Sequence, residues 1–371
     1  MLVQKPKHWA KIHELLRDNR GLRYFFIALI LIIATGVGLL IMLHRAPTYP
    51  PGSSSYHIKP KPKLYYSPLT GNQVENSAAT KQAVTAIMIE NSPDSRPQSG
   101  LKQSGVVFEA IAEGGITRFL ALYQQEKPQL IGPVRSLRPY YVSWLSPFNA
   151  SVAHVGGSYK ALQTVRNGKY RDIDQFFNPQ AYWRATDRWA PHNVYTNFAK
   201  LDALNKSKGY KTSKFTGFVR QTHDKRKLIA LAKDRAKNPL AKANSVNINI
   251  SSADYNVRYS YDAVHKFYLR FEGGAAHTDR EKGQITPRVV IAIKVPTKLA
   301  WEDGYREQMT TTGIGQAYIF QNGTVRKATW RKPSQLAQLR FLDANNKDIP
   351  LVAGQTWITA TPTNQSVTWS K

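Results

Sequence analysis

The sequence predicts an α+β protein with an N-terminal transmembrane helix, a mixed α/β ectodomain and a smaller β-rich domain after it. Three observations support this class. Tyr24–Leu43 is an unbroken apolar run, strand and helix patterns alternate over 64–222, and strand patterns dominate 246–371. We therefore expect one membrane anchor followed by two folded regions.

The apolar run 24–43 contains no charged residue, Asn, Gln or Pro. A helix of this length is about 30 Å long, which matches the hydrocarbon core of a bilayer. A buried core helix would normally show a polar stripe, and a cleaved signal peptide has a shorter apolar stretch that ends at small residues. Here the first small residue after the run is Ala46, followed by Pro47. We expect a retained anchor.

The flanks of the run predict its orientation. Residues 1–23 hold six Lys or Arg and two acidic residues, whereas Arg45 is the only basic residue between the run and Lys59. The positive-inside rule places the tail 1–23 in the cytoplasm and the ectodomain outside the cell membrane as a single-pass protein. Residues 44–63 contain five prolines and Gly-Ser-Ser-Ser, which is typical of an extended stalk.

The first folded region, 64–222, has three clear strand patterns and two short helix patterns. The strands are predicted at Ala83–Ile89, Val106–Ala112 and Arg118–Tyr123, and the helices at Tyr140–Leu145 and Tyr159–Val165. Gly114-Gly115 predicts a hairpin turn between the second and third strands. A mixed α/β sandwich follows from this order.

A basic segment, 223–245, separates the two folded regions. Residues 200–242 carry 13 Lys or Arg against three Asp, and Arg226–Lys237 has helical apolar spacing. Such a segment is usually a solvated helix and linker, and direct contact with a polyanion is the alternative.

The second folded region, 246–371, reads as a series of strands. They are predicted at Val246–Ser251, Tyr255–Tyr261, His265–Phe271, Val289–Lys294, Ala317–Gln321 and Thr324–Arg331. Asn322-Gly323 predicts a two-residue hairpin, because both central residues of a type I′ turn need positive φ.

The charge balance is strongly basic, with a net charge of +28. Removing the seven basic and two acidic residues of 1–45 from totals of 52 and 24 leaves 45 basic and 22 acidic residues, a net charge of +23. Such a field attracts anionic cell-envelope polymers or glycans, acidic lipids and DNA, although general solubility explains it as well. Nucleic acid is the least favoured of these partners.

The chain has no cysteine, so disulfides and thiolate metal sites are excluded. It also lacks HExxH, P-loop, GxSxG and EF-hand patterns. We assign no metal ligands and no cofactor.

Polar residues cluster in the first folded region and define the candidate site. The candidates for binding an anionic ligand are Arg96, Arg118, Arg135, Arg138, Arg188 and Asn193. The candidates for acid/base chemistry are Glu90, Glu113, His154, Asp187 and His192. Arginine pairs bidentately with phosphate or carboxylate, and a carboxylate or His beside it can move a proton.

Each of these residues also has a structural interpretation. Glu109 and Glu113 lie four apart, which in a regular strand places both on one face, and a solvated face explains them as well as a site does. His154 on an apolar strand is often a core histidine, and Asp187 can pair with a neighbouring arginine. The prediction of a pocket therefore depends on how many such residues cluster in this region, and not on any one of them.

Four segments in order resemble the YerB-like family of bacterial membrane-attached cell-surface proteins. They are ENSPDSRPQSGL (90–101), VFEAIAEGGITRFLALY (107–123), IGPVRSLRPYY (131–141) and AHVGGS (153–158). The segments GQAYIFQNGTVRKATW and GQTWI are similar to the family's C-terminal domain. The resemblance implies a two-domain extracytoplasmic protein and no known reaction. Many members are anchored through a lipid-bearing cysteine, which this chain lacks.

Whether the protein is an enzyme stays open at this stage. The first hypothesis is a binding protein that holds an anionic envelope glycan or polymer in an Arg-rich pocket. The alternative is a hydrolase or transferase acting on a phosphate-bearing envelope substrate.

Overall fold

The computed structural model describes residues 19–44, 63–237, 239–300 and 304–371. The chain divides into two compact units, Met1–Pro62 and Lys63–Lys371. Most of the predicted tail 1–23 and of the stalk 44–63 lies outside the described residues. In the first unit, α2 (Arg20–His44) covers the predicted apolar run and is long and apolar enough to cross a membrane.

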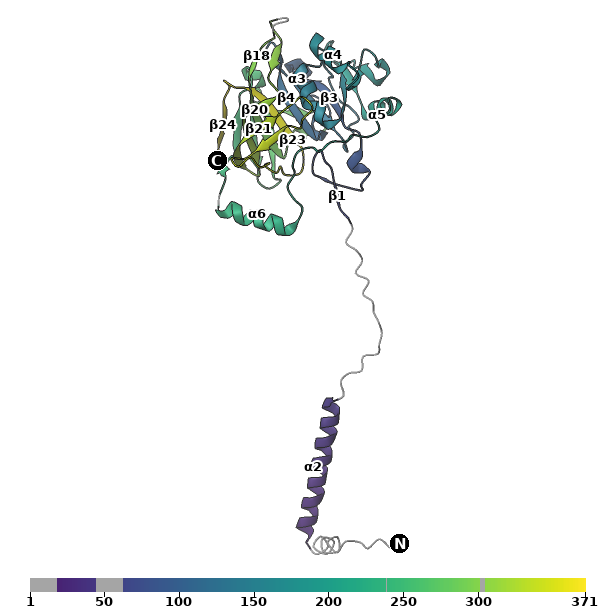
Figure 1. Cartoon of the computed structure of the whole chain (residues 1–371), viewed down its shortest axis with the longest axis vertical. Coiled ribbons are helices and arrows are strands. Elements are labelled where there is room, and N and C mark those ends of the chain that lie inside the picture. The colour runs from purple at the N-terminus through teal and green to yellow at the C-terminus, as the bar shows by residue number, and fades with distance from the viewer. Residues whose placement is uncertain (1–18, 45–62, 238, 301–303) are drawn as a thin grey trace. The chain divides into compact units, whose positions relative to one another are not determined.

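The second unit is built around a large mixed sheet (Figure 1). Its order is β10 (Ala241–Lys242), β21 (Thr324–Lys332), β20 (Gly313–Gln321), β17 (Val289–Val295), β23 (Thr356–Pro362), β4 (Val106–Glu113), β5 (Ile116–Tyr123), β3 (Thr85–Glu90), β6 (Ser151–His154) and β7 (Arg171–Asp174), with β22 (Arg340–Leu342) beside β21. Strands β17, β23, β4, β3, β6 and β7 point the same way, because β23 is parallel to both β17 and β4, and β5 is antiparallel to both β4 and β3.

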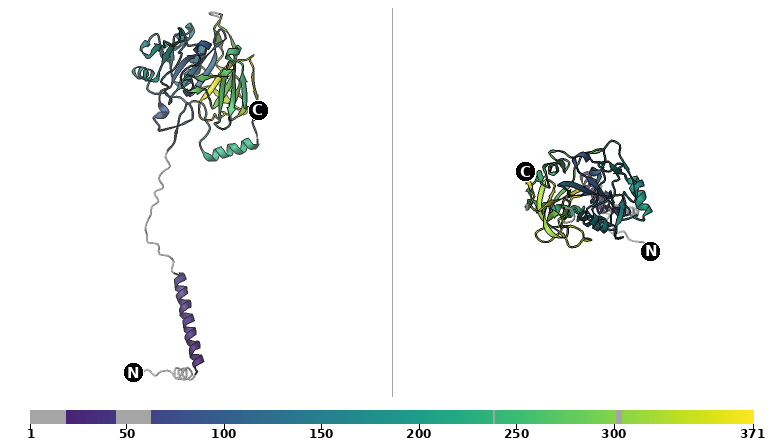
Figure 2. Two further views of the ribbon diagram at one scale, coloured as in Figure 1. Left: turned by 180° about the vertical axis from the view of Figure 1, so that it is seen from behind. Right: turned by 90° about the horizontal axis from the view of Figure 1, so that it is seen from above.

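The two halves of the sequence share this sheet. Strand β23, from the C-terminal half, pairs in parallel with β4 through Thr356↔Val106 and Thr359↔Glu109. Figure 2 shows the N-terminal half, in blue and teal, beside the C-terminal half, in green and yellow. The boundaries 64–222, 223–245 and 246–371 stay a prediction, and the sheet adds that the halves are joined strand to strand.

Smaller elements complete the second unit. A five-stranded sheet has the order β14 (Ala275–Ala276), β13 (Phe267–Glu272), β12 (Val257–Asp262), β11 (Ser245–Ile248) and β24 (Val367–Ser370). Four strand pairs are β1–β2 (Tyr65–Tyr66, Gln73–Val74), β8–β9 (Tyr182–Arg184, Val194–Thr196), β15–β16 (Thr278–Asp279, Gly283–Gln284) and β18–β19 (Thr297–Leu299, Glu307–Met309). The α-helices are α3 (Pro139–Leu145), α4 (Tyr159–Val165), α5 (Phe198–Ser207) and α6 (Lys225–Lys237), and the 3₁₀ turns are η1 (Ala79–Lys81), η2 (Pro93–Ser95), η3 (Leu101–Gln103), η4 (Ser146–Phe148), η5 (Pro179–Ala181) and η6 (Ala253–Tyr255).

The two faces of the large sheet are covered differently. On one face, Trp144 of α3 stacks on Phe108 of β4 with ring centroids 5.5 Å apart, and the Tyr141 hydroxyl donates to the Ala110 carbonyl. On the other face, Arg270 of β13 reaches Glu109 of β4. Strand β4 is therefore buried on both faces, which is why it reads as a nearly continuous apolar run.

The fold class predicted from the sequence is confirmed, and most predicted elements appear within a few residues. Asn322 and Gly323 have φ of 54° and 66° between β20 and β21, as the predicted hairpin requires. Four predicted strands extend beyond the observed ones, because residues 249–251 leave β11, Tyr255 belongs to η6 rather than to β12, and residues 83–84 and 265–266 precede β3 and β13.

Candidate functional site

The candidate site lies where parallel strands of the large sheet end. Strands β3, β4, β6 and β7 finish at Glu90, Glu113, His154 and Asp174. Ligands of α/β sheets commonly bind at the carboxyl ends of parallel strands. The sequence therefore brings four ionisable side chains to one edge.

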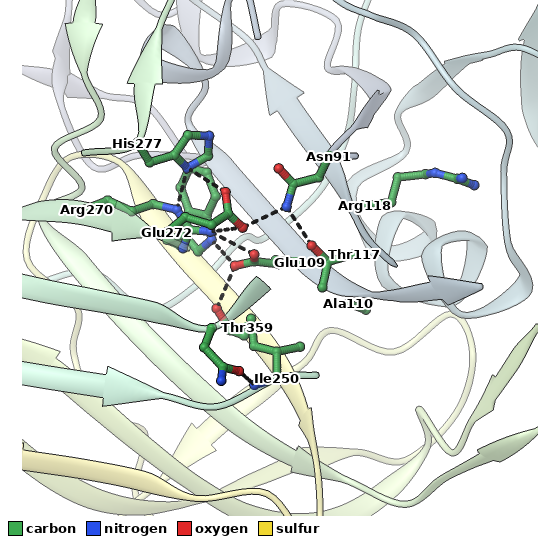
Figure 3. Close-up of polar contacts among 12 residues, drawn as sticks. Asn91, Glu109, Ala110, Thr117, Arg118, Ile250, Arg270, Glu272, His277 and Thr359 are labelled. Carbon is green, nitrogen blue, oxygen red and sulfur yellow. Dashed lines mark hydrogen bonds and ion pairs between the residues drawn. The ribbon is translucent and has the colours of Figure 1, made fainter. Parts of the chain in front are cut away.

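Alternation of side chains divides the polar residues at this edge between the two faces of the sheet. Glu90 and Arg118 are register partners and lie on the α3 face, whereas their neighbours Asn91 and Thr117 bond to each other on the opposite face. Figure 3 shows Thr117 directed toward Asn91 and Arg118 directed away from it. Two clusters result, back to back.

The first is the arginine cluster, which consists of Arg118, Arg135, Arg138, Glu90, Glu113 and His192. Glu113 joins two of its arginines. Its carboxylate accepts from Arg118 Nη2 at 2.7 Å and, through the other oxygen, from Arg138 Nη2. The two arginines are also fixed by backbone carbonyls, of Ser136 and Leu137 respectively. Both guanidinium groups are thereby held in place.

The ion pairs set the charge state of Glu113. Burial, the largest single influence, raises the pKa of its carboxyl, but the charges and hydrogen bonds of Arg118 and Arg138 outweigh burial and leave the pKa below its ordinary value. Burial and the neighbouring Arg118 charge lower the pKa of Arg138, although Glu113 opposes both. Glu113 is therefore ionised at neutral pH and is a weak base.

Glu90 anchors the other half of the arginine cluster. Its Oε1 lies 3.1 Å from Arg135 Nε, 3.0 Å from His192 Nδ1 and 3.1 Å from Ser92 Oγ. Ser92 Oγ also contacts the same His192 Nδ1, at 3.2 Å. A nucleophile–His–acid relay needs the two partners on opposite ring nitrogens. Here both partners share Nδ1, and Asp94 Oδ2 lies 4.0 Å from Nε2, too far for a hydrogen bond, so no relay is formed.

A cavity of about 340 Å³ adjoins the arginine cluster. Arg138 lines it together with Lys160 of α4, Arg306 and the hydroxyls of Ser143, Ser158 and Thr311. Thr311 donates to Ser143 at 2.9 Å, which links the C-terminal half to α3 across the cavity. Among the described residues, the buried Arg138 Nε and Ser158 Oγ make no hydrogen bond. The lining thus offers cationic and hydroxyl groups to a ligand.

The second cluster is the buried network, which consists of Asn91, Glu109, Thr117, Arg270, Glu272, His277, Trp357 and Thr359. Arg270, which is fully buried, donates to Glu109 and to His277 Nδ1, both at 2.7 Å. Glu109 also accepts from Trp357 Nε1 at 2.8 Å and from Thr359 Oγ1 at 3.1 Å. Figure 3 shows Glu109, Arg270, His277 and Thr359 gathered between strands of the two halves.

The proton distribution in the buried network follows from its hydrogen bonds. Burial lowers the pKa of His277 well below its ordinary value, and Arg270 adds to this effect. His277 is thus neutral, accepts from Arg270 at Nδ1 and donates through Nε2 to Gln98 at 3.0 Å. Burial raises the pKa of Glu272 to about 7, against the opposing charge of Arg270. With no access to solvent, this network joins the halves and does not receive a ligand.

Glu109 and Glu113 do not share a face, and the expectation of a common solvated face is wrong. The pairing of β4 with β5 shifts register between Ile111 and Glu113. A β-bulge changes the alternation by one residue. Glu109 is consequently buried with Arg270, whereas Glu113 turns to Arg118.

The remaining predicted residues lie outside the arginine cluster. His154 is fully buried and bonds through both nitrogens, to Asp172 at 2.9 Å and to the Gly156 carbonyl at 2.8 Å. Asp187 pairs with Arg280 at 2.6 Å near the surface. His154 cannot exchange a proton with a ligand while both nitrogens are occupied, and Asp187 serves an ion pair.

The other predicted ligand-binding residues are also occupied. Arg188 donates to the carbonyls of Asp94 and Pro97, and Asn193 accepts from Arg184. Arg96 faces the buried network, where it donates to Asn91. Of the eleven predicted residues, Glu90, Glu113, Arg118, Arg135, Arg138 and His192 therefore come together, and the other five do not. Among the described residues, no three His, Asp or Glu side chains are placed to share a metal ion.

Sequence reasoning missed Arg270, Glu272 and the cavity residue Lys160. The strand 267–272 alternates regularly, so Arg270 reads as a solvated residue until its partner Glu109 is known. Lys160 is one of many lysines, and only the position of α4 distinguishes it. A charged residue flanked by Leu269 and Phe271 was the available signal for Arg270.

Comparison with known proteins supports the two-part organisation. Residues 69–211 match the N-terminal domain, and 246–358 the C-terminal domain, of DUF3048, described as a protein of unknown function. A candidate lipoprotein of Bacillus subtilis, YerB, is 30% identical over 315 residues, covering 83% of this chain and 90% of YerB. The crystal structure of Bacillus subtilis YerB is similar, with a TM-score of 0.70 and 29% identity over 82% of this chain and 99% of that one.

Proposed function

The chain belongs to the DUF3048 family, and from this premise we propose that it is a membrane-anchored protein that binds an anionic group of a cell-envelope polymer at the arginine cluster. One observation carries the proposal: Arg138 belongs to the arginine cluster and also lines a 340 Å³ cavity beside Lys160. A phosphate or carboxylate on a sugar-sized unit matches this combination of size and charge.

The proposed anchor is α2, with the N-terminus in the cytoplasm and Lys63–Lys371 outside. The apolar helix and the lipoprotein relative both indicate membrane association. The orientation is supported by the basic residues that precede α2, because positively charged flanks stay on the cytoplasmic side. Without a cysteine, the chain has no site for a lipid anchor on a thiol.

The charge of the cavity supports an anion rather than a neutral sugar. Among the described lining residues, Arg138, Lys160 and Arg306 are cationic and Glu307 is the one carboxylate, while Glu113 pairs with Arg138. The ectodomain's excess of basic residues raises the local concentration of any polyanion, and this long-range effect is screened by salt. Ser143, Ser158 and Thr311 add hydroxyls that suit the oxygens of a polyol or saccharide.

Binding is favoured over hydrolysis by the positions of the ionisable groups. Glu113 is held ionised by two arginines, His154 is enclosed, and Ser92 and Glu90 share one nitrogen of His192. None of these three arrangements presents a base to the cavity. The hydrolase hypothesis therefore stays without geometric support.

The test is a binding assay that compares substitution of a lysine in the cavity with substitution of a lysine outside it. The full chain in nanodiscs is titrated with poly(glycerol phosphate), and with neutral dextran as the uncharged polymer. Lys160→Gln should weaken poly(glycerol phosphate) binding by about fivefold, which corresponds to one lost charged contact of about 1 kcal/mol. Lys169→Gln, an exposed lysine that is not among the cavity residues, is the matched control and should change binding less than twofold.

Three outcomes would contradict the proposal. They are equal binding of dextran, equal effects of the two lysine variants, and binding that does not weaken with added salt. Competition with duplex DNA tests whether nucleic acid is the partner instead. Stronger binding of DNA than of poly(glycerol phosphate) would replace the proposed partner by nucleic acid.

A further inference from the structure

Helix α6 (Lys225–Lys237) carries an unusual charge pattern. Its sequence contains six Lys or Arg and one Asp, and three of the basic residues fill its first turn. Basic residues at a helix N-terminus oppose the helix dipole, and only Asp224, which accepts from the backbone of Arg226 at 2.8 Å, compensates there. A helix of thirteen residues is marginal by itself in water. A negatively charged surface would therefore stabilise α6.

Apolar residues of α6 form a stripe at helical spacing, and four of its six basic residues lie off that stripe. Leu228, Ala232 and Ala236 follow one another at intervals of four and form one stripe, with Ile229 beside it. Arg226, Lys227, Lys233 and Lys237 lie away from this stripe. An apolar stripe flanked by basic residues is the pattern of helices that lie in the interface of an anionic membrane.

Packing within the second unit does not account for the apolar stripe. Leu228 and Ile229 have exposed fractions of 39% and 58%, and no α6 residue whose burial is described is buried. In both Figure 1 and Figure 2 the helix stands apart from the sheets. Its apolar face is thus available to another surface.

We propose that α6 docks on the surface of a lipid membrane with anionic headgroups. The argument for this occupant is charge complementarity together with the anchor proposed above, on which the inference rests. Residues 45–62, between α2 and the second unit, can span at most about 65 Å at 3.6 Å per residue. This tether limits how far the second unit can move from the membrane, and a tether of this kind makes even weak binding effective.

The test uses the absence of native cysteine, which lets a single introduced thiol carry a probe. Ala232→Cys and Ala230→Cys are a matched pair, because both sites are exposed alanines and they lie on opposite sides of α6. Each variant of the full chain is labelled with an environment-sensitive fluorophore. It is then reconstituted in nanodiscs of phosphatidylcholine alone or with phosphatidylglycerol.

The expected result is a blue shift of the label at position 232, and not at 230, only in nanodiscs that contain phosphatidylglycerol. Lys227→Gln or Lys233→Gln should each reduce the docked fraction, by roughly fivefold in the docking constant, because each basic residue near an anionic surface contributes about that factor. Added salt should reverse the shift.

Three results would contradict the docking of α6 on an anionic membrane. No shift at 232, equal shifts at 232 and 230, or the same shift without phosphatidylglycerol would each overturn the proposal. A shift caused by soluble poly(glycerol phosphate) and not by lipid would assign α6 to a polymer instead. Failure of the chain to co-purify with nanodiscs would refute the anchor, and a silent label in a chain that does co-purify would refute only the docking of α6.

Discussion

Replacing Arg270 by Met should destabilise the second unit by removing the only cation that contacts Glu109 among the described residues. Arg270 is fully buried and holds Glu109 through an ion pair of 2.7 Å, while Trp357 and Thr359 supply only neutral donors. A buried carboxylate without its cation is expected to take up a proton or to disrupt the packing around it.

The largest part of the expected loss in stability is the cost of adding that proton. Protonating a carboxyl of ordinary pKa near 4.3 at pH 7 costs about 3 to 4 kcal/mol, at 1.36 kcal/mol per pH unit. The lost hydrogen bonds to Tyr259 and His277 add about 1 kcal/mol each, partly offset by the apolar Met side chain. We expect the free energy of unfolding to fall by about 4 kcal/mol at pH 7, and by only about 1.5 kcal/mol at pH 5.

The assay is urea unfolding of residues 63–371 at both pH values, followed by tryptophan fluorescence. Glu109→Gln combined with Arg270→Met should recover about 3 kcal/mol at pH 7, since residue 109 then carries no buried charge to neutralise. Arg258→Met is the control, because Arg258 is an exposed arginine stacked on Phe271 at 3.8 Å and should matter by less than about 1 kcal/mol. A loss that is the same at both pH values, or a double variant no more stable than Arg270→Met, would refute the reasoning.

Three further predictions concern stability. Burial raises the pKa of Glu272 from 4.5 to about 7, so between these pH values the folded state binds a proton that the unfolded state does not. The stabilisation that Glu272 contributes is therefore complete below pH 4.5 and is lost as the pH rises to 7. Glu272→Gln should remove that loss of stability, as measured by urea titrations at pH 5 and 7. The pKa of Glu113 is shifted downward, so its stabilisation is present at neutral pH and is lost in acid. Glu113→Gln should lower the free energy of unfolding by about 2 kcal/mol at pH 7, and its difference from the wild type should shrink as the pH falls below 4.5. Gly323→Ala should lower the thermal midpoint, at a cost of about 1 to 3 kcal/mol, because φ is 66° and the new methyl group would lie 2.6 Å from Tyr261; an unchanged midpoint would contradict the strained turn.

Prediction from sequence succeeded where the signal is local. The length and apolarity of 24–43, the helix at Tyr159–Val165 and the turn at Asn322-Gly323 each depend on residues adjacent in the chain. The grouping of Arg118, Arg135 and Arg138 was also within reach, because strand ends and the loops after them gather functional residues.

Prediction failed where partners are distant in sequence. Arg270 and Glu109 are 161 residues apart, and neither reveals that the other is buried against it. The bulge after Ile111, which separates Glu109 from Glu113, depends on the pairing of β4 with β5 and has no distinct local pattern.

The sequence by itself determined the apolar helix, the fold class, the basic charge and the family to which the chain belongs, because each follows from composition or from residues close together. Only the tertiary structure decided which of the eleven predicted residues meet. Pairing between distant strands places Glu90 and Arg118 on one face and Asn91 and Thr117 on the other, and it joins the two halves in one sheet. Register between distant segments is set by the packing of the whole sheet, so it cannot be read from any one of them.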